Sequence, residues 1–419
     1  MQVFLYNLFL LLFKAGTYIV SLFNTKAKKW VQGRKHIFKR LKEAIPSSEK
    51  IIWIHCASLG EFEQGKPLME RFKAQYPGFK ILLTFFSPSG YEAQKDYKGA
   101  DWVFYLPLDG PFNAKRFLEI AHPSLVIFVK YEFWYYYLKK IKYRSIPLIL
   151  VSALFRKDMS FFKWYGGLQR KMLSRFDHLF VQNEASKKLV DGVGLAGICS
   201  VSGDTRFDRV IEIAGKFEPI PEIEKFISGS RVIVAGSTWP EDEQVLQKAF
   251  AIRNDASLKL IIAPHEVSEK GLTALTKLFP DSIRYSSLMA PDSRPSSCLI
   301  IDNIGMLSRL YRYGYITYVG GGMTSYGVHN VLEAAVYSRP VIMGPHYQKY
   351  IEAIGLVECG GATVIKDETD LAKTISKLLD NWDDCYKKSS EASGKYVQLH
   401  AGATQKILQV IQEKRLLTN

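Results

Sequence analysis

Glu61 is an acid at a position where phosphate usually binds. It follows Gly60 after the apolar run at residues 51–54, where a strand is predicted to give way to a helix. Helix N-termini at strand ends commonly bind anions, because their free N–H groups and the helix dipole favour negative charge. A carboxylate there either completes a capping box at its own helix start or projects into a ligand site. Glu61 is therefore the first candidate for chemistry.

Other residues suited to chemistry also follow apolar runs. Each is weak alone, since strand ends routinely carry turn glycines and helix caps. In open α/β sheets, however, ligands bind at the carboxyl ends of the strands, so several strand ends can share one site. The set comprises Glu61, Glu132, Asp204, Arg206, residues 236–238, Pro264, His265 and residues 320–322. Together they predict a binding cleft.

Residues 318–345, YVGGGMTSYGVHNVLEAAVYSRPVIMGP, form the strongest single block. Consecutive glycines let the backbone approach a ligand closely. A helix is predicted to begin near His329 or Asn330 and to end before Pro340, with Glu333 one turn in. Its N-terminus would favour a phosphate, and Glu333 could accept hydrogen bonds from ribose hydroxyls. The alternative is a glycine turn followed by a satisfied helix cap.

The absence of two common nucleotide-binding motifs and of cysteine pairs limits the classes of ligand and metal site that are expected. Neither G-x-x-x-x-G-K-[ST] nor G-x-G-x-x-G occurs, which disfavours P-loop and dinucleotide sites and indicates a nucleotide with few phosphates. The five cysteines are widely spaced and form no C-x-x-C pair. This spacing indicates neither a disulfide framework nor a metal site, and it fits a reducing cytoplasm.

Two series of short apolar runs must position these residues. The first series is IIWIH, KILLTFF, LVIFV, PLILVSA, HLFVQ and ICSVSGD, and the second is RVIVAGS, LKLIIAP, CLIID, YITYVGGG and RPVIMGP. Such runs, separated by helical patterns, are typical of parallel sheets covered on both faces. The predicted fold class is α/β, with doubly wound domains at residues 26–217 and 218–419. Pro219 and Pro221 mark an extended linker, and the last helix is free to pack back on the N-terminal domain.

Charge and composition point to an anionic partner. The chain has 419 residues, 47% of them hydrophobic, which suffices for two cores. Lys and Arg outnumber Asp and Glu by 56 to 41, giving a net charge of +15. Such an excess suits nucleic acid, an anionic membrane or a phosphorylated substrate, or is simply a basic soluble surface. Nucleic acid is not expected, because no recognition motif is visible and the charges concentrate near the N-terminus.

Residues 1–25 are predicted to form a membrane anchor helix. The apolar stretch is about as long as a hydrocarbon core is thick, but Lys14 interrupts it near the middle, so spanning and interfacial helices are both open. A buried helix is the alternative, and a cleaved signal peptide is disfavoured because basic residues follow without a cleavage site. Those residues would hold the next domain in the cytoplasm against anionic lipid. They are Lys26, Lys28, Lys29, Arg34, Lys35, Lys39, Arg40 and Lys42.

Taken in order, the motifs resemble those of the Kdo transferase family. SLGEFEQGKPL, GDTRFDRV, AGSTWPEDE, APHE and YVGGGMTSYGVHNVLEAA follow the apolar helix, and the resemblance covers essentially the whole chain. Kdo transferases attach 3-deoxy-D-manno-octulosonic acid (Kdo) to the lipid A precursor in lipopolysaccharide synthesis. The resemblance implies a GT-B fold, in which two Rossmann-like domains face each other across a cleft. It also implies CMP-Kdo as donor, lipid IVA as acceptor, an inverting mechanism without metal or other cofactor, and a place on the cytoplasmic face of the inner membrane.

The resemblance also implies roles for individual residues. The family's catalytic base is the Glu of an S-x-G-E motif, here Ser58, Gly60 and Glu61, with Ser58 and Gly60 on the acceptor side. Glu132 matches a second acidic residue, and Arg206 matches a basic residue after a G-[ND] turn. The implied donor site comprises Ser237, Pro264, His265, Gly305, Met306, Leu307, Gly321, His329, Asn330, Val331, Leu332 and Glu333.

Four segments depart from the family pattern. Arg206 stands where a Lys is common, so a cation is kept. The usual G-G-H-N reads GVHN at residues 327–330, which retains His and Asn. The usual E-T-E-L-W-P-N reads KYEFWYY at residues 130–136, and the usual P-R-H reads APH at residues 263–265. One acid and one arginine of the pattern are therefore missing.

A carboxylate at Glu61 suits the attack of a sugar hydroxyl on a donor. By removing the hydroxyl proton in the transition state, a positioned carboxylate can contribute roughly 10²–10⁴-fold. The helix dipole favours the ionised form that a base requires. Arg206 and the helix start near Asn330 are candidates to stabilise the charge on the leaving CMP. His265 is a candidate phosphate contact, whereas His55 is expected only to satisfy local hydrogen bonds.

Two other functions remain open from the sequence. A different GT-B protein would use a UDP-sugar for transfer or epimerisation, and comparing CMP with UDP binding separates the two. A basic nucleic-acid-binding protein would bind strands in a salt-dependent manner. The apolar N-terminus and the order of the motifs favour Kdo transfer over both.

Overall fold

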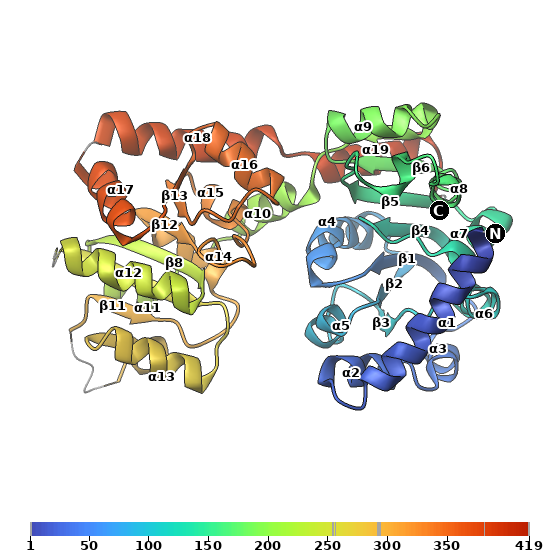
Figure 1. Ribbon diagram of the computed structural model, residues 1–419, viewed down its shortest axis with the longest axis horizontal. Coiled ribbons are helices and arrows are strands. Elements are labelled where there is room, and N and C mark those ends of the chain that lie inside the picture. Colours follow the sequence, from blue (N-terminus) through green and yellow to red (C-terminus); the bar gives the residue numbers. More distant parts are fainter. Residues whose placement is uncertain (1, 254, 256, 291–294, 381, 418–419) are drawn as a thin grey trace. The chain divides into compact units, whose positions relative to one another are not determined.

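Each of the two units of the chain is built on a seven-stranded parallel sheet (Figure 1). The computed structural model describes residues 2–253, 255, 257–290, 295–380 and 382–417. By contacts, one unit comprises the chain up to Arg209 together with the segment from Ala401, and the other comprises Val210–His400. Strands alternate with helices in both units, which confirms the predicted α/β fold class.

The strands of the first unit are buried on both faces. They are β1 (Lys50–Cys56), β2 (Phe79–Phe85), β3 (Trp102–Tyr105), β4 (Pro123–Val129), β5 (Leu148–Ala153), β6 (His178–Val181) and β7 (Cys199–Val201). The sheet order is β3-β2-β1-β4-β5-β6-β7. Alternate residues of β1 enter opposite cores, Ile51 and Trp53 on one face and Ile52 and Ile54 on the other. Two buried faces explain why the strand reads as a continuous apolar run.

Helices cover both faces of this sheet. They are α1 (Gln2–Val20), α2 (Thr25–Gly33), α3 (Ile37–Ala44), α4 (Leu59–Gln75), α5 (Pro88–Gln94), α6 (Pro111–Ala121), α7 (Tyr135–Tyr143), α8 (Gly167–Leu173), α9 (Glu184–Asp191), α10 (Thr205–Gly215) and α19 (Ala403–Glu413), with 3₁₀ turns η1 (Ser160–Phe162) and η2 (Ala196–Ile198). Side chains of α3, α6, α7 and α8 fill one core, and those of α4 and α19 fill the other.

The contacts divide the chain within α10, between Arg209 and Val210. The predicted domain limit lay further along, between residues 217 and 218. The last helix, α19, belongs to the first unit, where Ile407 and Ile411 join the core that α4 covers. The segment from Ala401 therefore belongs to the first unit, and not to the second unit with residues 218–400.

The second unit repeats the same architecture around its own core. Its strands are β8 (Arg231–Thr238), β9 (Leu258–Pro264), β10 (Ser282–Arg284), β11 (Cys298–Ile300), β12 (Ile316–Val319), β13 (Val341–Met343) and β14 (Ala362–Val364). The order is β10-β11-β9-β8-β12-β13-β14. Ile233, Leu260 and Tyr318 lie in its main core cluster.

Helices of the second unit differ from the predictions at one important place. They are α11 (Pro221–Ile227), α12 (Pro240–Arg253), α13 (Glu269–Leu278), α14 (Leu307–Leu310), α15 (Leu332–Ala335), α16 (Ile351–Glu358), α17 (Glu368–Asp380) and α18 (Lys388–Leu399), with short turns η3 (Tyr285–Ser287), η4 (Tyr311–Tyr313) and η5 (Trp382–Lys387). The helix predicted to begin near His329 or Asn330 and to end before Pro340 forms later and is short, beginning at Leu332. Only α15, four residues long, forms there.

The predicted apolar N-terminal helix is present as α1, which packs on the first unit by one face. Among the described residues, α1 is the helix long and apolar enough to cross a membrane. The Tyr6 hydroxyl donates to Asp109 Oδ2 at 2.7 Å, the Tyr136 hydroxyl donates to Asn7 Oδ1 at 2.8 Å, and the Phe13 ring lies near Trp30. The other faces remain exposed. Their apolar side chains are Phe4, Leu5, Leu8, Phe9, Leu11, Leu12, Ile19 and Val20.

The glycine run after β12 approaches a neighbouring backbone very closely. A Cβ atom on Gly322 would lie 2.7 Å from the backbone nitrogen of Gly344, the residue after β13. Real Cβ atoms do not tolerate such a distance, and a backbone atom cannot rotate away as a side chain can. Gly322 is therefore required for packing at the carboxyl ends of β12 and β13.

Replacing Gly322 by Ala is expected to destabilise the protein by about 1–3 kcal/mol, because the added methyl group overpacks a rigid backbone contact. The matched control is Gly78→Ala, where an added Cβ would meet nothing within 4 Å. This control should change stability by no more than about 0.5 kcal/mol. Urea unfolding midpoints measure both changes, and equal midpoints for the two variants would contradict the packing assignment.

Candidate active site

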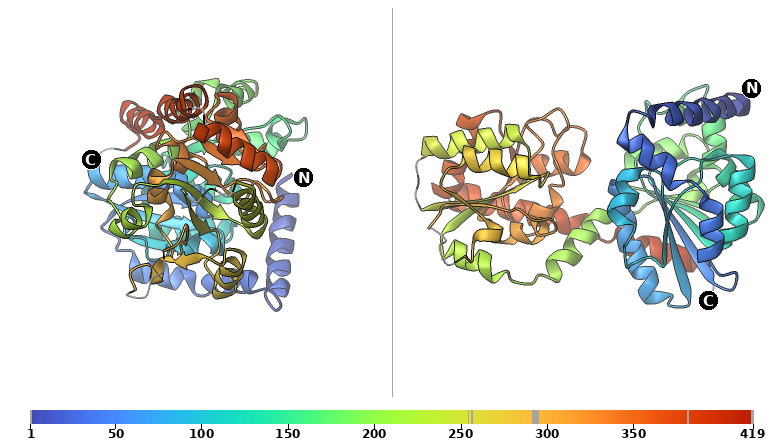
Figure 2. Two further views of the ribbon diagram at one scale, coloured as in Figure 1. Left: turned by 90° about the vertical axis from the view of Figure 1, so that its left-hand side faces the viewer. Right: turned by 90° about the horizontal axis from the view of Figure 1, so that it is seen from below.

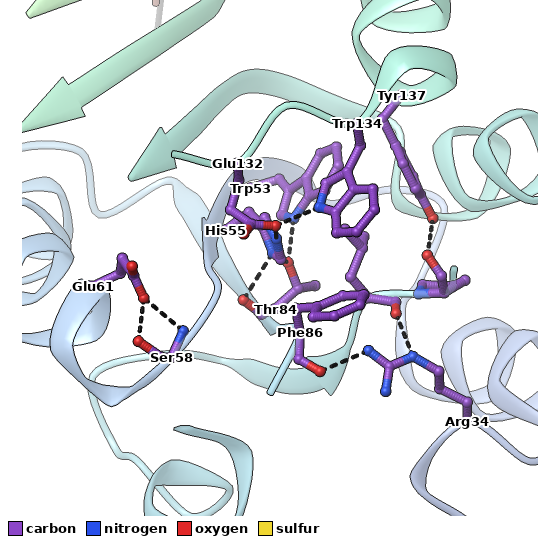
Figure 3. Close-up of polar contacts among 12 residues, drawn as sticks. Arg34, Trp53, His55, Ser58, Glu61, Thr84, Phe86, Glu132, Trp134 and Tyr137 are labelled. Atoms are coloured by element: carbon purple, nitrogen blue, oxygen red, sulfur yellow. Dashed lines mark hydrogen bonds and ion pairs between the residues drawn. The ribbon is translucent and has the colours of Figure 1, made fainter. Parts of the chain in front are cut away.

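Glu61 lies in the first turn of α4, directly beyond the carboxyl end of β1 (Figure 3). The backbone N–H of Ser58 donates to Glu61 Oε2 at 2.8 Å, and the Ser58 hydroxyl donates to the same oxygen. This arrangement is a capping box, one of the two interpretations predicted from the sequence. Glu61 Oε1 has no hydrogen-bond partner among the described residues. The half-buried carboxylate is thus held by one oxygen and open at the other.

Glu132 lies beyond β4, and a buried histidine anchors its carboxylate (Figure 3). His55 is 0% exposed, and its Nε2 lies 3.1 Å from Glu132 Oε2. The indole N–H of Trp134 donates to the same oxygen. His55 satisfies hydrogen bonds, as expected, but one of them orients a candidate catalytic carboxylate. The sequence did not indicate this pairing.

Trp53 and Thr84 hold the other ring nitrogen of His55. The indole N–H of Trp53 donates to Thr84 Oγ1 at 2.8 Å, and His55 Nδ1 lies 2.8 Å from the same hydroxyl and 3.1 Å from the Thr84 carbonyl oxygen. The contacts at Nδ1 fix the ring, which directs Nε2 at Glu132. A chain of buried side chains therefore orients the Glu132 carboxylate.

Arg206 is held by Asp204 at the start of α10. Its Nε and one terminal nitrogen donate to Asp204 Oδ2 at 3.0 and 2.7 Å, and Gln64 Nε2 donates to the same carboxylate at 3.0 Å. Burial opposes the ionisation of Asp204, but Arg206 outweighs it and Lys130 adds to the effect, so the pKa of Asp204 lies below its usual value. Asp204 therefore acts as a fixed anion that positions the guanidinium. Gln64 and Lys130 were not predicted as site residues.

Three carboxylates of the first unit lie beyond the carboxyl ends of its strands. They are Glu61, Glu132 and Asp204. Burial raises the pKa of Cys56, and Glu61 and Glu132 raise it further. Burial likewise raises the pKa of Tyr131, to which Glu61 and Asp204 contribute. Glu61 acts on both groups, whereas Glu132 acts on Cys56 and Asp204 acts on Tyr131, so the surroundings of Glu61 overlap with those of the other two carboxylates. The first unit thus brings together the residues predicted at the ends of β1, β4 and β7.

In the second unit, aromatic rings stack at the carboxyl ends of β8 and β9. The rings of Trp239 and His265 lie 4.8 Å apart, and those of His265 and His329 lie 4.3 Å apart, both stacked. The Trp239 indole N–H donates to His329 Nε2 at 2.9 Å. Burial and the neighbouring His265 lower the pKa of His329 to about 4, so this ring is neutral at pH 7. His265 and His329 were predicted as donor-site residues, whereas Trp239 was not.

Asp242 ties this stack to the glycine run. Its carboxylate accepts hydrogen bonds from the backbone N–H groups of Trp239 and Gly321, at 2.9 and 2.8 Å, and from the Tyr318 hydroxyl at 2.8 Å. Burial raises the pKa of Asp242, although these bonds oppose the rise. Asp242 was not predicted as a site residue, although it lies in the motif AGSTWPEDE. A buried acid in that motif is the signal that could have identified it.

Asn330 and Glu333 interact with each other at the short helix α15. Asn330 Nδ2 donates to Glu333 Oε1 at 2.9 Å, and Asn330 Oδ1 accepts from the Leu332 N–H at 3.3 Å. With only four residues, α15 offers much less dipole than the longer helix predicted there. The polar groups for a ligand at this position are therefore the side chains of Asn330 and Glu333.

The remaining predicted donor residues lie in different settings. Val331 and Leu332 are 0% exposed, so no atom of either residue is open to a ligand. Pro264 and His265 line a pocket of about 320 Å³ beside Trp239. Within the described residues, no group of three or more His, Cys, Asp or Glu side chains could hold a metal ion. The others are Ser237, Gly305, Gly321, Met306 and Leu307, the first three with φ of 53°, 100° and 86°.

Solved structures share the two-unit architecture of this chain. A putative UDP-N-acetylglucosamine 2-epimerase from Listeria monocytogenes has a TM-score of 0.60 and 16% identity, covering 89% of this chain and 98% of its own. A UDP-GlcNAc 2-epimerase from Neisseria meningitidis has a TM-score of 0.61 and 15% identity, covering 87% of this chain and 100% of its own. At such low identity the likeness shows the fold alone, which is GT-B.

Sequence relatives are closer. The family described as "3-Deoxy-D-manno-octulosonic-acid transferase (kdotransferase)" matches residues 32–209. The 3-deoxy-D-manno-octulosonic acid transferase of Aquifex aeolicus is 30% identical over 370 residues, 85% of this chain and 94% of the relative. That of Haemophilus influenzae is 26% identical over 374 residues, 86% of each chain. The chain therefore belongs to the 3-deoxy-D-manno-octulosonic acid transferase family and is a glycosyltransferase of that family.

Proposed function

We propose that the protein transfers Kdo from CMP-Kdo to the lipid A precursor, lipid IVA, in lipopolysaccharide synthesis, with inversion at the anomeric carbon. The 30% identity to a transferase matched over 94% of its length is the observation that carries this proposal. The test is to incubate the purified protein with CMP-Kdo and lipid IVA and to count the added sugars by mass. An unchanged acceptor mass, in a preparation that binds CMP, would contradict it.

Glu61 is the proposed general base. The acceptor hydroxyl forms a bond to the anomeric carbon as the bond from that carbon to the CMP phosphate oxygen breaks, and the hydroxyl proton passes to the base. Glu61 supports this role because Oε2 is held by Ser58 while Oε1 stays open. The cap positions the carboxylate and leaves one oxygen for the proton. The two interpretations of Glu61 are therefore compatible.

Glu132 and Arg206 are proposed to support this step. Oε2 of Glu132 is held by donors from His55 and Trp134, and these rings fix the direction of a carboxylate that is proposed to bind and orient a hydroxyl. Arg206, aligned by Asp204, is proposed to stabilise the negative charge that develops on the leaving CMP. Each role depends on a partner that fixes the direction of the side chain.

The second unit is the proposed CMP-Kdo-binding domain. The stack of Trp239, His265 and His329 offers flat aromatic surfaces and polar edges beside the glycine run. Glu333 is proposed to accept hydrogen bonds from ribose hydroxyls. Neutral His329 can hold a proton on Nδ1 and donate it to a ligand oxygen, since its Nε2 accepts from Trp239.

A place on the cytoplasmic face of the inner membrane is proposed from the N-terminal segment. The apolar helix α1 exposes most of its length, and basic residues follow it directly. Apolar burial and attraction to anionic lipid both favour binding at a membrane surface. Such a position brings the enzyme to an acceptor that is itself a lipid.

Glu61→Gln tests the base. Glutamine can still accept the Ser58 N–H but cannot take a proton usefully, so transfer should drop by at least about 10²-fold while CMP affinity is unchanged. Stability should fall by about 1 kcal/mol or less. Turnover with CMP-Kdo, CMP titration and thermal melting measure these quantities.

Glu63→Gln is the matched control, since Glu63 lies on the same helix outside the capping box. It should leave transfer close to normal. Near-normal transfer by Glu61→Gln would remove Glu61 from the role of base and make Glu132 the next candidate. An equal loss in both variants would mean that charge on α4, rather than proton removal, matters.

Glu333→Ala tests the donor site. If the carboxylate holds ribose hydroxyls through charge-assisted bonds, CMP binding should weaken by about 1–3 kcal/mol. Glu358→Ala, at the exposed end of α16, is the control and should leave CMP affinity unchanged. Calorimetric titration with CMP and with UDP measures the loss and the base preference together. Unchanged CMP affinity in a folded Glu333→Ala protein would exclude Glu333 from the site.

A further inference from the structure

A basic pocket of about 350 Å³ lies in the first unit, between α1, α2, α3 and α6. None of its lining residues is acidic, and none belongs to the proposed catalytic or donor sites. Aromatic and aliphatic side chains, among them Tyr18, Trp30 and Phe38, form much of its wall. Its basic residues are Lys14, Arg34, His36, Lys39 and Arg116. A pocket that is both cationic and apolar suits an anionic amphiphile.

Arg34 is the most buried cation of this pocket (Figure 3). It donates to the backbone oxygens of Leu106 and Phe86, each at 2.9 Å, and to that of Trp30 at 3.2 Å. Its guanidinium lies 3.9 Å from the centre of the Trp30 ring. Within the described residues it forms no ion pair with a carboxylate, and burial lowers its pKa to about 9, which leaves it charged at pH 7. All three of these hydrogen bonds go to backbone carbonyls, so no described carboxylate neutralises the charge that Arg34 presents to the pocket.

Trp30 forms an apolar wall of the pocket beneath Arg34. The residue is 7% exposed, and its indole N–H is buried. Trp30 lines the pocket together with Arg34, whose guanidinium lies over its ring. The pocket therefore places a cation directly on an aromatic surface.

The surface beside the pocket is apolar. Lys14 and Tyr18 of α1 line the pocket, while the same helix exposes Leu11, Leu12 and Ile19. Figure 2, in its right-hand view, shows α1 lying along the outside of the first unit. An anion bound here would sit next to a surface suited to hydrocarbon, which is how the headgroup and chains of a lipid are arranged.

We propose that this pocket binds the phosphate headgroup of an anionic membrane lipid, separately from the sugar donor and the acceptor. Arg34 and Arg116 supply charge and planar N–H donors, which match phosphate oxygens. Trp30 supplies an apolar wall, and α1 lies beside the chains. Occupancy by a headgroup would hold α1 parallel to the membrane surface, with Lys14 at the level of the phosphates.

The test compares two double variants of the full-length protein. Lys14→Gln/Arg116→Gln removes two charges from the pocket, and Lys26→Gln/Lys28→Gln removes two exposed charges from the same basic region outside it. Sedimentation with phosphatidylcholine vesicles that contain phosphatidylglycerol measures binding. Both variants lose two charges, so general attraction to the anionic surface should fall by the same amount in each. The pocket variant also loses contacts to the headgroup, so its affinity for the vesicles should fall about tenfold further. Equal losses in the two variants would overturn the proposal.

Two further measurements distinguish the source of the phosphate. Vesicles of phosphatidylcholine alone should bind at least about tenfold more weakly, because they lack net negative charge. Inorganic phosphate should displace the protein from the vesicles no better than chloride at equal ionic strength. Displacement by phosphate alone would assign the pocket to a free anion instead of a lipid. Thermal melts confirm that each variant is folded, and Arg116→Lys, which keeps the charge but not the fork, should retain part of the binding.

Discussion

The burial of both faces of each parallel sheet is the constraint on which the rest of this structure depends. Strands such as β1 can carry almost only apolar side chains, so polar groups collect where the strands end. Those groups are still buried, and a buried polar group must find a partner. His55 therefore pairs with Thr84 and Glu132, and Asp242 pairs with the turn after β8 and with the glycine run. The site residues are therefore oriented by the requirement that buried polar groups form hydrogen bonds.

Three carboxylates at this edge have different surroundings, and the surroundings separate their roles. Asp204 faces a guanidinium, which stabilises its charge and makes it a structural anion. Glu132 has one oxygen occupied by donors from buried rings. Glu61 is held only by the start of its own helix, and one oxygen stays open. Glu61 and Glu132 are each held through Oε2, but Glu61 by its own helix start and Glu132 by two rings from other parts of the unit.

The N-terminal helix and the catalytic edge share supporting residues. Asp109 accepts the Tyr6 hydroxyl of α1 and also the N–H groups of Tyr136 and Tyr137, so it docks α1 and caps α7 at once. The Phe86 ring packs 4.8 Å from Trp134, which holds Glu132, while the Phe86 carbonyl accepts from Arg34. The face that is proposed to meet the membrane is therefore built into the same packing as the acidic site.

Local patterns in the sequence determined the elements and the places of most candidate residues. Apolar runs predicted the strands, and the position of Glu61 after Gly60 predicted a helix start with a capping acid, because these features depend on neighbours within a few residues. The ordered motifs likewise predicted the family. The helix after Asn330 was overestimated, since its C-terminal turn tightens into bonds from Tyr337 to Ala334 and from Ser338 to Ala335, and Ser338 then takes a left-handed φ of 52°.

Only the tertiary structure decides which residues far apart along the chain form hydrogen bonds with each other. His55 meets Thr84 and Glu132 at separations of 29 and 77 residues, and Gln64 meets Asp204 at 140. The basic pocket likewise combines Lys14 with Arg116, residues on different helices. A sequence specifies which side chains bury and which helices begin where, because both depend on local chemistry. Which buried groups then share a hydrogen bond depends on how the sheet and its helices pack, and that packing brought His55 to Glu132 and Arg34 to the carbonyls of Leu106 and Phe86.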